Sequence, residues 1–161
     1  MRSMTSIRLM SALLLTGVLS LTTALYGQAP AAPPQALTYE MAVQVIDAAE
    51  AEARKNKWNM TIVVTDAAGV PIVLRRLTGA TARSYDLAAR KAATVVATKL
   101  TTAAYGEQLK TKAVAEVPNG VNFAGGVPIM RGGEFIGAIG TSGARADQDE
   151  VVSKAGADLI K

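Results

Sequence analysis

The sequence predicts an α+β domain in which helices pack on an antiparallel sheet, with the element order α-β-β-α-α-β-β-α. Two observations lead to this prediction. Two pairs of β-rich segments are each joined by a short turn, which favours antiparallel hairpins. Segments with helical spacing of apolar residues or many helix-forming residues lie before, between and after these pairs.

The first helix is expected from Thr38, a typical N-cap residue, to about Lys57. One face of this helix is apolar and consists of Ala42, Val45, Ile46, Ala49 and Ala53. The first hairpin then joins strands Met60 to Thr65 and Pro71 to Leu77 through a turn at 66–69. Proline lacks a backbone donor, so Pro71 suits the start or the edge of a strand.

An alanine-rich helix is predicted from about Arg83 to Thr98, followed by a shorter helix from Thr101 to Leu109. A further short strand is considered at 121–124. The last helix should begin near Asp147, which together with Glu150 resembles a capping box.

The second hairpin joins Val127 to Arg131 with Glu134 to Thr141 through Gly132-Gly133, because two glycines can both take positive φ. The glycine-rich stretch 124–150 matches neither a P-loop nor a dinucleotide fingerprint. Gly137 and Gly140 lie inside the second strand of this hairpin, where glycine indicates close approach by another backbone or a ligand.

The N-terminus has the pattern of a secretory signal peptide. Arg2 and Arg8 are basic, and Leu9 to Leu21 is an apolar run of thirteen residues. We expect a signal peptide at 1–29, a Pro/Ala linker at 30–37 and one domain at 38–161, with export to the periplasm or the exterior and no stable membrane span after processing. An uncleaved N-terminal anchor is the alternative, although the run is shorter than the roughly 20 residues of a spanning helix.

Composition excludes several functions. The chain has no cysteine and no histidine, which rules out Ser-His-Asp and Cys-His catalysis and ordinary zinc sites, so no metal site is expected. Removal of Arg2 and Arg8 lowers the net charge from +4 to +2, and only 4% of residues are aromatic. A nucleic-acid partner is therefore not expected. No catalytic residue is assigned.

Basic residues gather around the second strand and the following helix: Arg75, Arg76, Arg83, Arg90 and Lys91. Arg75 and Arg76 should point to opposite faces of the strand, so at most one of them joins a pocket. The start of the helix, with Arg83, could receive a carboxylate or another anion. The alternative is a solvated basic face with ion pairs to Asp66 or Asp86. Tyr85 and Tyr105 are either phenolate ligands or packing residues that form hydrogen bonds.

From about Leu37 to Lys161 the chain resembles the GlcG/HbpS family, the haem-degrading domain family related to the PduO C-terminal domain. The resemblance rests on VVTDAAGVPIVLRRLTGA at 63–80, SYDLAARKAATV at 84–95, GGVPIMRGGEFIGAIGTSG at 125–143, and Asp149 with the helix that follows it. It implies a profilin-like fold, dimers or larger rings, and binding of haem or a related tetrapyrrole in some members. Gly125, Gly126, Gly137 and Gly140 would then let backbone approach a helix, a second subunit or a flat ligand.

Three functions follow from these observations. The first is an exported binding protein that holds haem or a related tetrapyrrole in a subunit groove. Arg76 or Arg83 would meet the propionates. Because histidine is absent, the iron would have to accept Tyr85 or Tyr105, Met130, a lysine, or no side chain at all. The ring would lie between the helix at 83–98 and the strand at 134–143. The alternatives are an enzyme acting on a small carboxylated or aldehyde metabolite and a homo-oligomeric module without its own ligand. The lack of histidine and cysteine favours a binding protein over an enzyme.

Overall fold

The computed structural model of the protein describes residues 36–161, so the predicted signal peptide and nearly all of the predicted linker lie outside the described residues. The elements are α1 (Tyr39–Lys55), β1 (Thr61–Asp66), β2 (Pro71–Arg76), α2 (Ala82–Thr98), α3 (Thr102–Lys110), β3 (Gly126–Arg131), β4 (Glu134–Ser142) and α4 (Ala146–Ala157). Their order confirms the predicted α+β arrangement. None of the helices within 36–161 is long and apolar enough to cross a bilayer.

The four strands form one antiparallel sheet in the order β2-β1-β4-β3. The central strands β1 and β4 come from different hairpins, and β2 and β3 form the two edges. Val63 of β1 lies opposite Leu74 of β2 and Gly140 of β4. Since directly opposed residues point to the same face of a sheet, Leu74, Val63 and Gly140 define one face.

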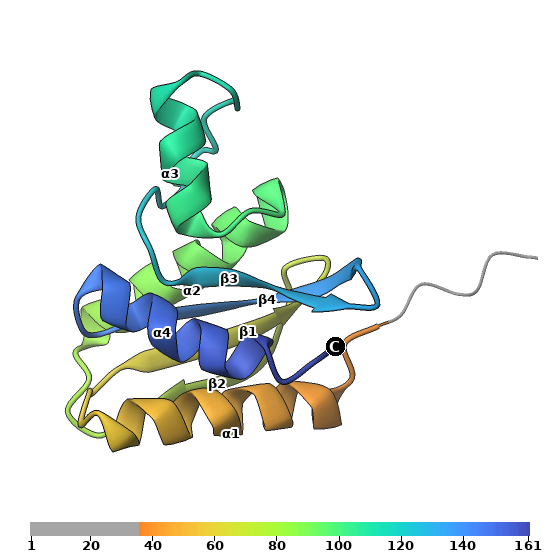
Figure 1. The fold of residues 1–161 in the computed structure, drawn as a ribbon. Helices are drawn as coiled ribbons and strands as arrows, with labels where there is room; N and C mark the ends of the chain where they lie inside the picture. The colour runs from red at the N-terminus through yellow and green to blue at the C-terminus, as the bar shows by residue number, and fades with distance from the viewer. Residues whose placement is uncertain (1–35) are drawn as a thin grey trace, which may run out of the picture. The chain divides into compact units, whose positions relative to one another are not determined.

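Helices cover the two faces of the sheet unequally (Figure 1). On one face α1 packs on β1 and β2, and α4 packs on β3 and β4, so that every strand is covered. On the other face α2 packs on β1, β4 and β3. Helix α3 and the loop after it contact α2 and β3 and form an arm at the top of Figure 1. The face of β2 that lies on the α2 side is consequently left partly open.

Most local predictions are confirmed by the backbone. Thr38 caps α1 by accepting a hydrogen bond from Met41 N at 3.3 Å. Gly132 and Gly133 have φ of +55° and +84°, which are the values a primed hairpin turn requires.

Two local predictions are wrong. Residues 121–124 form no strand, because Gly126 is the first residue of β3 to pair with β4. Helix α4 begins at Ala146, as predicted to within one residue, but Asp147 and Glu150 form no capping box. Arg145 is the N-cap, and Gln148 Oε1 accepts from Arg145 N at 3.2 Å. Asp147 instead pairs with Arg145 at 2.8 Å.

The two glycines inside β4 are approached by different elements. A Cβ on Gly140 would overlap the Ala88 carbonyl oxygen and would lie 2.7 Å from Ala92 N, so α2 rests directly on the strand. A Cβ on Gly137 would overlap the Thr65 carbonyl oxygen and would lie 2.8 Å from Leu37 Cδ2 on the opposite face. The glycines therefore allow close packing on both faces.

Replacement of Gly140 by valine should destabilise the domain by about 1–3 kcal/mol, because the branched side chain must displace the backbone of α2. Urea unfolding followed by circular dichroism measures this change. Glu134→Val, at the exposed start of the same strand, is the control and should change the free energy of unfolding by less than about 0.5 kcal/mol. Equal stability of Gly140→Val and the parent would show that α2 does not rest on this position.

Candidate functional site

The basic residues predicted to cluster are separated by the fold. Arg75 points toward α1 and pairs with Asp47 and Glu50, each at 2.6 Å. Arg90 pairs with Asp86 at 3.7 Å and donates from Nε to the Asn119 carbonyl oxygen, so it holds the arm. The predicted alternative, a basic face with ion pairs, is thus correct for Arg90 and Asp86. The carboxylate of Asp66 instead accepts from Ala68 N and Val70 N within the β1–β2 turn.

Arg76 and Tyr85, in contrast, are brought to the same side of the sheet. Arg76 lies opposite Thr61, whose hydroxyl is hydrogen-bonded at 2.8 Å to the Ser84 hydroxyl at the start of α2. Arg76 Nε donates to the Ala80 carbonyl oxygen at 3.0 Å, which orients the guanidinium. Tyr85 is 51% exposed and belongs to α2, the helix that packs on this side of the sheet.

We call this surface the α2–β2 shelf and define it by Leu74, Arg76, Tyr85 and Val96. Leu74 is 45% exposed, because α2 does not extend over β2. Val96 lies beside the β1–β2 turn, since a Cβ on Gly69 would be 3.5 Å from Val96 Cγ1. Tyr85 and Val96 are eleven residues apart and therefore share one flank of the helix. The shelf combines apolar side chains with one cation and one phenol.

The other predicted ligand residues lie elsewhere. Arg83 is exposed but precedes Tyr85 by two residues, which turns it about 200° around the helix and away from the shelf. Tyr105 is buried, and its hydroxyl accepts from Val117 N at 2.7 Å, so it packs the arm. Gly125 and Gly126 lie against Lys91, at the edge of the sheet where β3 begins.

Sequence reasoning missed the most buried charges of the described chain. Lys91 of α2 and Asp149 of α4 form an ion pair of 2.7 Å with side chains 0% and 3% exposed. Lys91 Nζ also donates to the Thr141 carbonyl oxygen at 2.9 Å and lies 5.1 Å from the centre of the Phe123 ring. Lys91 is therefore not part of a solvated basic face, and Asp149 is its buried partner.

A polar network surrounds this pair. Asp149 Oδ1 accepts from Ala144 N at 3.1 Å. The Thr141 hydroxyl bonds the Asp149 carbonyl oxygen, and the Ser153 hydroxyl donates to the Gly125 carbonyl oxygen at 2.8 Å. A Cβ on Gly125 would overlap Lys91 Nζ, so glycine is needed for the lysine to reach its partners.

Burial dominates the protonation chemistry of the pair. It lowers the pKa of Lys91 because the ammonium is desolvated, although Asp149 acts in the opposite direction. Burial also raises the pKa of Asp149, although hydrogen bonds from Lys91 and Ala144 N oppose the shift. Since neither side chain is accessible to a substrate, the pair serves to connect helices.

The sequence pattern indicates that Lys91 is buried but does not identify Asp149 as its partner. Lys91 falls on the inward stripe of α2 with Ala88, Ala92 and Val95, where a charge requires a buried partner. Nothing in the local pattern identifies a partner 58 residues further on. Within residues 36–161, no three Asp or Glu side chains lie close enough to hold a metal ion together.

An open four-stranded antiparallel sheet with helices on both faces defines an α+β protein. The family model of HbpS-like haem-degrading proteins matches residues 37–158. The chain therefore belongs to the HbpS-like family, which confirms the resemblance found in the sequence.

Individual relatives agree with this assignment. Protein GlcG of Escherichia coli K12 is 33% identical over 108 residues, which cover 66% of this chain and 81% of GlcG. A crystal structure of a Streptomyces reticuli HbpS double mutant has a TM-score of 0.73 and 29% identity, covering 87% of this chain and 98% of HbpS. The crystal structure of a PduOC–haem complex has a TM-score of 0.67 and 28% identity, covering 79% of this chain and 96% of PduOC.

Replacement of Lys91 by methionine should destabilise the domain by about 3–5 kcal/mol, because Asp149 is left buried without its partner. The double variant Lys91→Met/Asp149→Leu should recover much of this loss, since no buried charge then remains. Chemical unfolding of both variants measures the two free energies. Lys110→Met, which removes an exposed pair with Glu107, is the control and should cost less than about 1 kcal/mol. If Asp149→Leu lowered the free energy of unfolding of the Lys91→Met variant further instead of raising it, the assignment of a buried charge pair would be contradicted.

Proposed function

We propose that this protein binds haem or a related flat tetrapyrrole on the α2–β2 shelf. Two findings support the proposal. The chain belongs to a family named for haem degradation, and PduOC, a relative of the same fold, has been solved as a haem complex. The observation that carries it in this chain is that Leu74, Arg76 and Tyr85 lie on the α2 side of the sheet, where the helix leaves β2 partly open.

The chemistry of the shelf suits such a ligand. A tetrapyrrole ring needs apolar contact, which Leu74 and Val96 offer, and its propionates need a cation, which Arg76 supplies at the rim. The chain has no histidine, so Tyr85 is the side chain on the shelf that can approach the iron. An anionic phenolate oxygen favours ferric over ferrous iron.

The position predicted for the ring from sequence is closed. Helix α2 and strand β4 touch at Gly140, and no space for a flat ligand remains between them. The shelf lies on the other flank of α2. Of the ligand residues predicted from the sequence, it includes Arg76 and Tyr85. Arg83 and Tyr105 are not needed in this arrangement.

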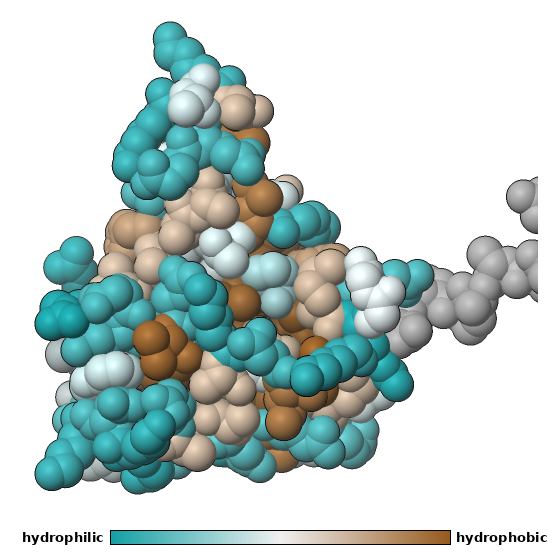
Figure 2. All heavy atoms as spheres, in the orientation of Figure 1, coloured by the Kyte–Doolittle hydropathy of each residue, from teal (hydrophilic) through white to brown (hydrophobic). Residues whose placement is uncertain are grey.

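We further propose that a second copy of the chain completes the site. The shelf contacts a ligand from one side, and β2 is an edge strand with free backbone groups. The face that carries α1 and α4 shows apolar side chains in separate patches among hydrophilic ones (Figure 2). On the α2 side, the exposed Leu74 and Tyr85 offer apolar surface for self-association.

Titration of the protein with ferric haemin should shift its Soret band saturably. Arg76→Ala should weaken binding about tenfold, because one charge-assisted hydrogen bond is lost. Tyr85→Phe should change the position of the Soret band by removing the iron ligand. Arg131→Ala and Tyr39→Phe remove exposed side chains away from the shelf and are the matched controls. Light scattering of the same samples should give a dimer or a larger assembly.

Absence of a saturable shift at tens of micromolar haemin would overturn the haem proposal. Equal affinity of Arg76→Ala and Arg131→Ala would place the ligand elsewhere. A monomer mass with and without haemin would remove the second copy from the site.

Export remains a proposal that rests on the sequence at 1–37. If the basic residues and the apolar run act as a signal peptide, the processed protein should begin between Leu25 and Ala32. N-terminal sequencing of protein recovered from the periplasm or the medium measures this. Intact Met1 on protein found in the cytosolic fraction would contradict export.

A further inference from the structure

The two edges of the sheet differ in how well they are protected against pairing with another strand. At the β3 edge the backbone groups of Gly126 and Pro128 face away from β4, since Thr141 N donates to the Gly125 carbonyl oxygen and the bonding residues alternate. Pro128 has no N–H, and Gly126 N donates to Thr102 Oγ1 of α3 at 2.9 Å. The β3 edge is therefore blocked by a proline and by α3.

The β2 edge, in contrast, is open over its second half. Leu77 N donates to the Met60 carbonyl oxygen at 3.0 Å. In an antiparallel pair, residues that bond the neighbouring strand alternate with residues that do not, so the backbone groups of Leu74 and Arg76 point away from β1. Within residues 36–161, no other backbone group pairs with them. The edge thus presents two free N–H and two free C=O groups.

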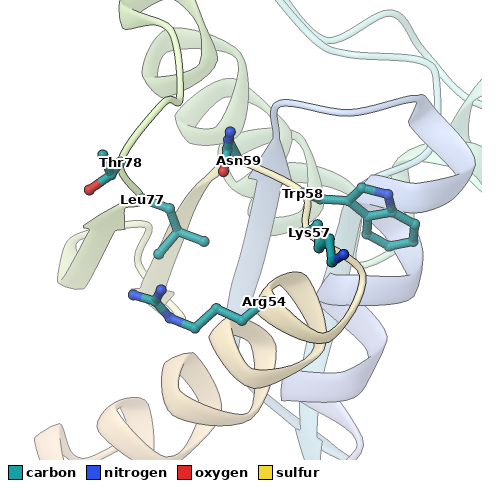
Figure 3. Close-up of a pocket in the computed structure, with 6 residues that line it drawn as sticks. All are labelled: Arg54, Lys57, Trp58, Asn59, Leu77 and Thr78. Atoms are coloured by element: carbon teal, nitrogen blue, oxygen red, sulfur yellow. The ribbon is translucent and has the colours of Figure 1, made fainter.

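The open segment is short, because other contacts shape the chain on either side of it. Before it, the register with β1 shifts at a bulge, and Pro71 has no N–H to offer. After it, the chain turns back toward α1: Figure 3 shows Leu77 in the wall of one pocket with Arg54 from the last turn of that helix. A partner strand is therefore expected along residues 74–76.

We propose that β2 pairs antiparallel with β2 of a second copy, about a two-fold axis at Arg75. In this register Leu74 lies opposite the partner's Arg76, and Arg76 lies opposite the partner's Leu74, so all four free groups of each copy are bonded. A register with Leu74 opposite itself would instead place Arg76 opposite the bulge. The inference gives the second copy of the proposed function a defined contact, and it rests on that part of the proposal rather than on haem.

The charges at the axis are compensated within each copy. Arg75 would lie opposite the partner's Arg75, and like charges in this position repel each other. However, Arg75 Nη1 lies 2.6 Å from a carboxylate oxygen of Asp47 and 2.6 Å from one of Glu50, and Glu50 also pairs with Arg54. These two arginines and two acids carry no net charge. The guanidinium of Arg75 is held toward α1, away from the axis.

Pairing at β2 would bring the two shelves to the same side of one continuous sheet. Because α2 packs over β4, and strands are about 4.8 Å apart, the two α2 helices would lie roughly 24 Å from each other. Helices about 10–12 Å in diameter then leave a groove roughly 12–14 Å wide. Its floor carries Leu74 and Arg76 from each copy. The two propionates of one haem can meet one Arg76 from each copy, which predicts one ligand per two chains.

Single cysteines test the register, because the chain contains no cysteine of its own. Arg75→Cys should form a disulfide-linked dimer on mild oxidation without haemin, since facing residues of this type have Cα atoms about 4.5 Å apart. Leu74→Cys should not, since its own copy is two residues out of register, about 8 Å away. Leu74 is more exposed than Arg75, so random collision would give the opposite order on a non-reducing gel.

A mixture of Leu74→Cys and Arg76→Cys keeps Arg75 and its ion pairs intact. The two variants together should give a mixed disulfide, identified by mass spectrometry, that neither gives alone, because their positions face each other about 5.5 Å apart. Self-cross-linking of Leu74→Cys as strong as that of Arg75→Cys would overturn the register. No cross-linking of Arg75→Cys or of the mixture would overturn the pairing.

A charge at the β2 edge should separate the two copies. Leu74→Lys should give a monomer mass in light scattering at micromolar concentration, because each lysine would face the partner's Arg76. Met130→Lys, at an exposed residue of the β3 edge, is the matched control and should keep the mass of the parent. Thermal unfolding of both variants checks that the fold is retained. The same assembly mass for both variants would contradict the pairing.

Titration with haemin distinguishes this inference from the haem proposal. The parent should take up one haemin per two chains. Cross-linking of Arg75→Cys without a saturable Soret shift of the parent would leave the edge pairing intact and remove haem. A Soret shift without cross-linking would leave the shelf and overturn the pairing. Saturation at one haemin per chain would overturn the shared groove.

Discussion

The buried ion pair between Lys91 and Asp149 joins helices that lie on opposite faces of one sheet. Lys91 extends from α2 past the start of β3 and meets Asp149 of α4, with Thr141 of β4 as a third partner. Two charges without water cost several kcal/mol each, and only close geometry with additional hydrogen bonds offsets this cost. The positions of α2, α4 and the first residues of β3 are therefore coupled through a single contact.

This coupling explains why glycine occurs where it does. Gly125 leaves room for the ammonium group of Lys91, and Gly140 lets the backbone of α2 rest on β4. Once α2 is held toward β3 and β4 in this way, it cannot also cover β2. The open face of β2, which carries Leu74 and Arg76, is thus a consequence of the Lys91–Asp149 contact at the opposite edge of the sheet.

The helix ends show a second recurring feature. Lysine adopts positive φ after α1, α2 and α3, at Lys57, Lys99 and Lys112. Glycine is the residue that usually takes this conformation at no steric cost, so each lysine is held there by the surrounding hydrogen bonds.

The sequence by itself determined the elements, their order and the family. Thr38, Pro71 and Gly132-Gly133 act through their own backbone or that of near neighbours, so their effect is visible in a short window of sequence. Tertiary structure decided which face of the sheet each helix covers. It thereby also decided which of the charged candidate residues are buried in ion pairs and which remain exposed. Lys91 and Asp149 are 58 residues apart in the sequence. Arg76 and Tyr85 lie on the same side of the sheet because of the position at which α2 packs on it. Periodicity indicates that a side chain points inward; only the packing of the whole domain selects the partner that it meets there.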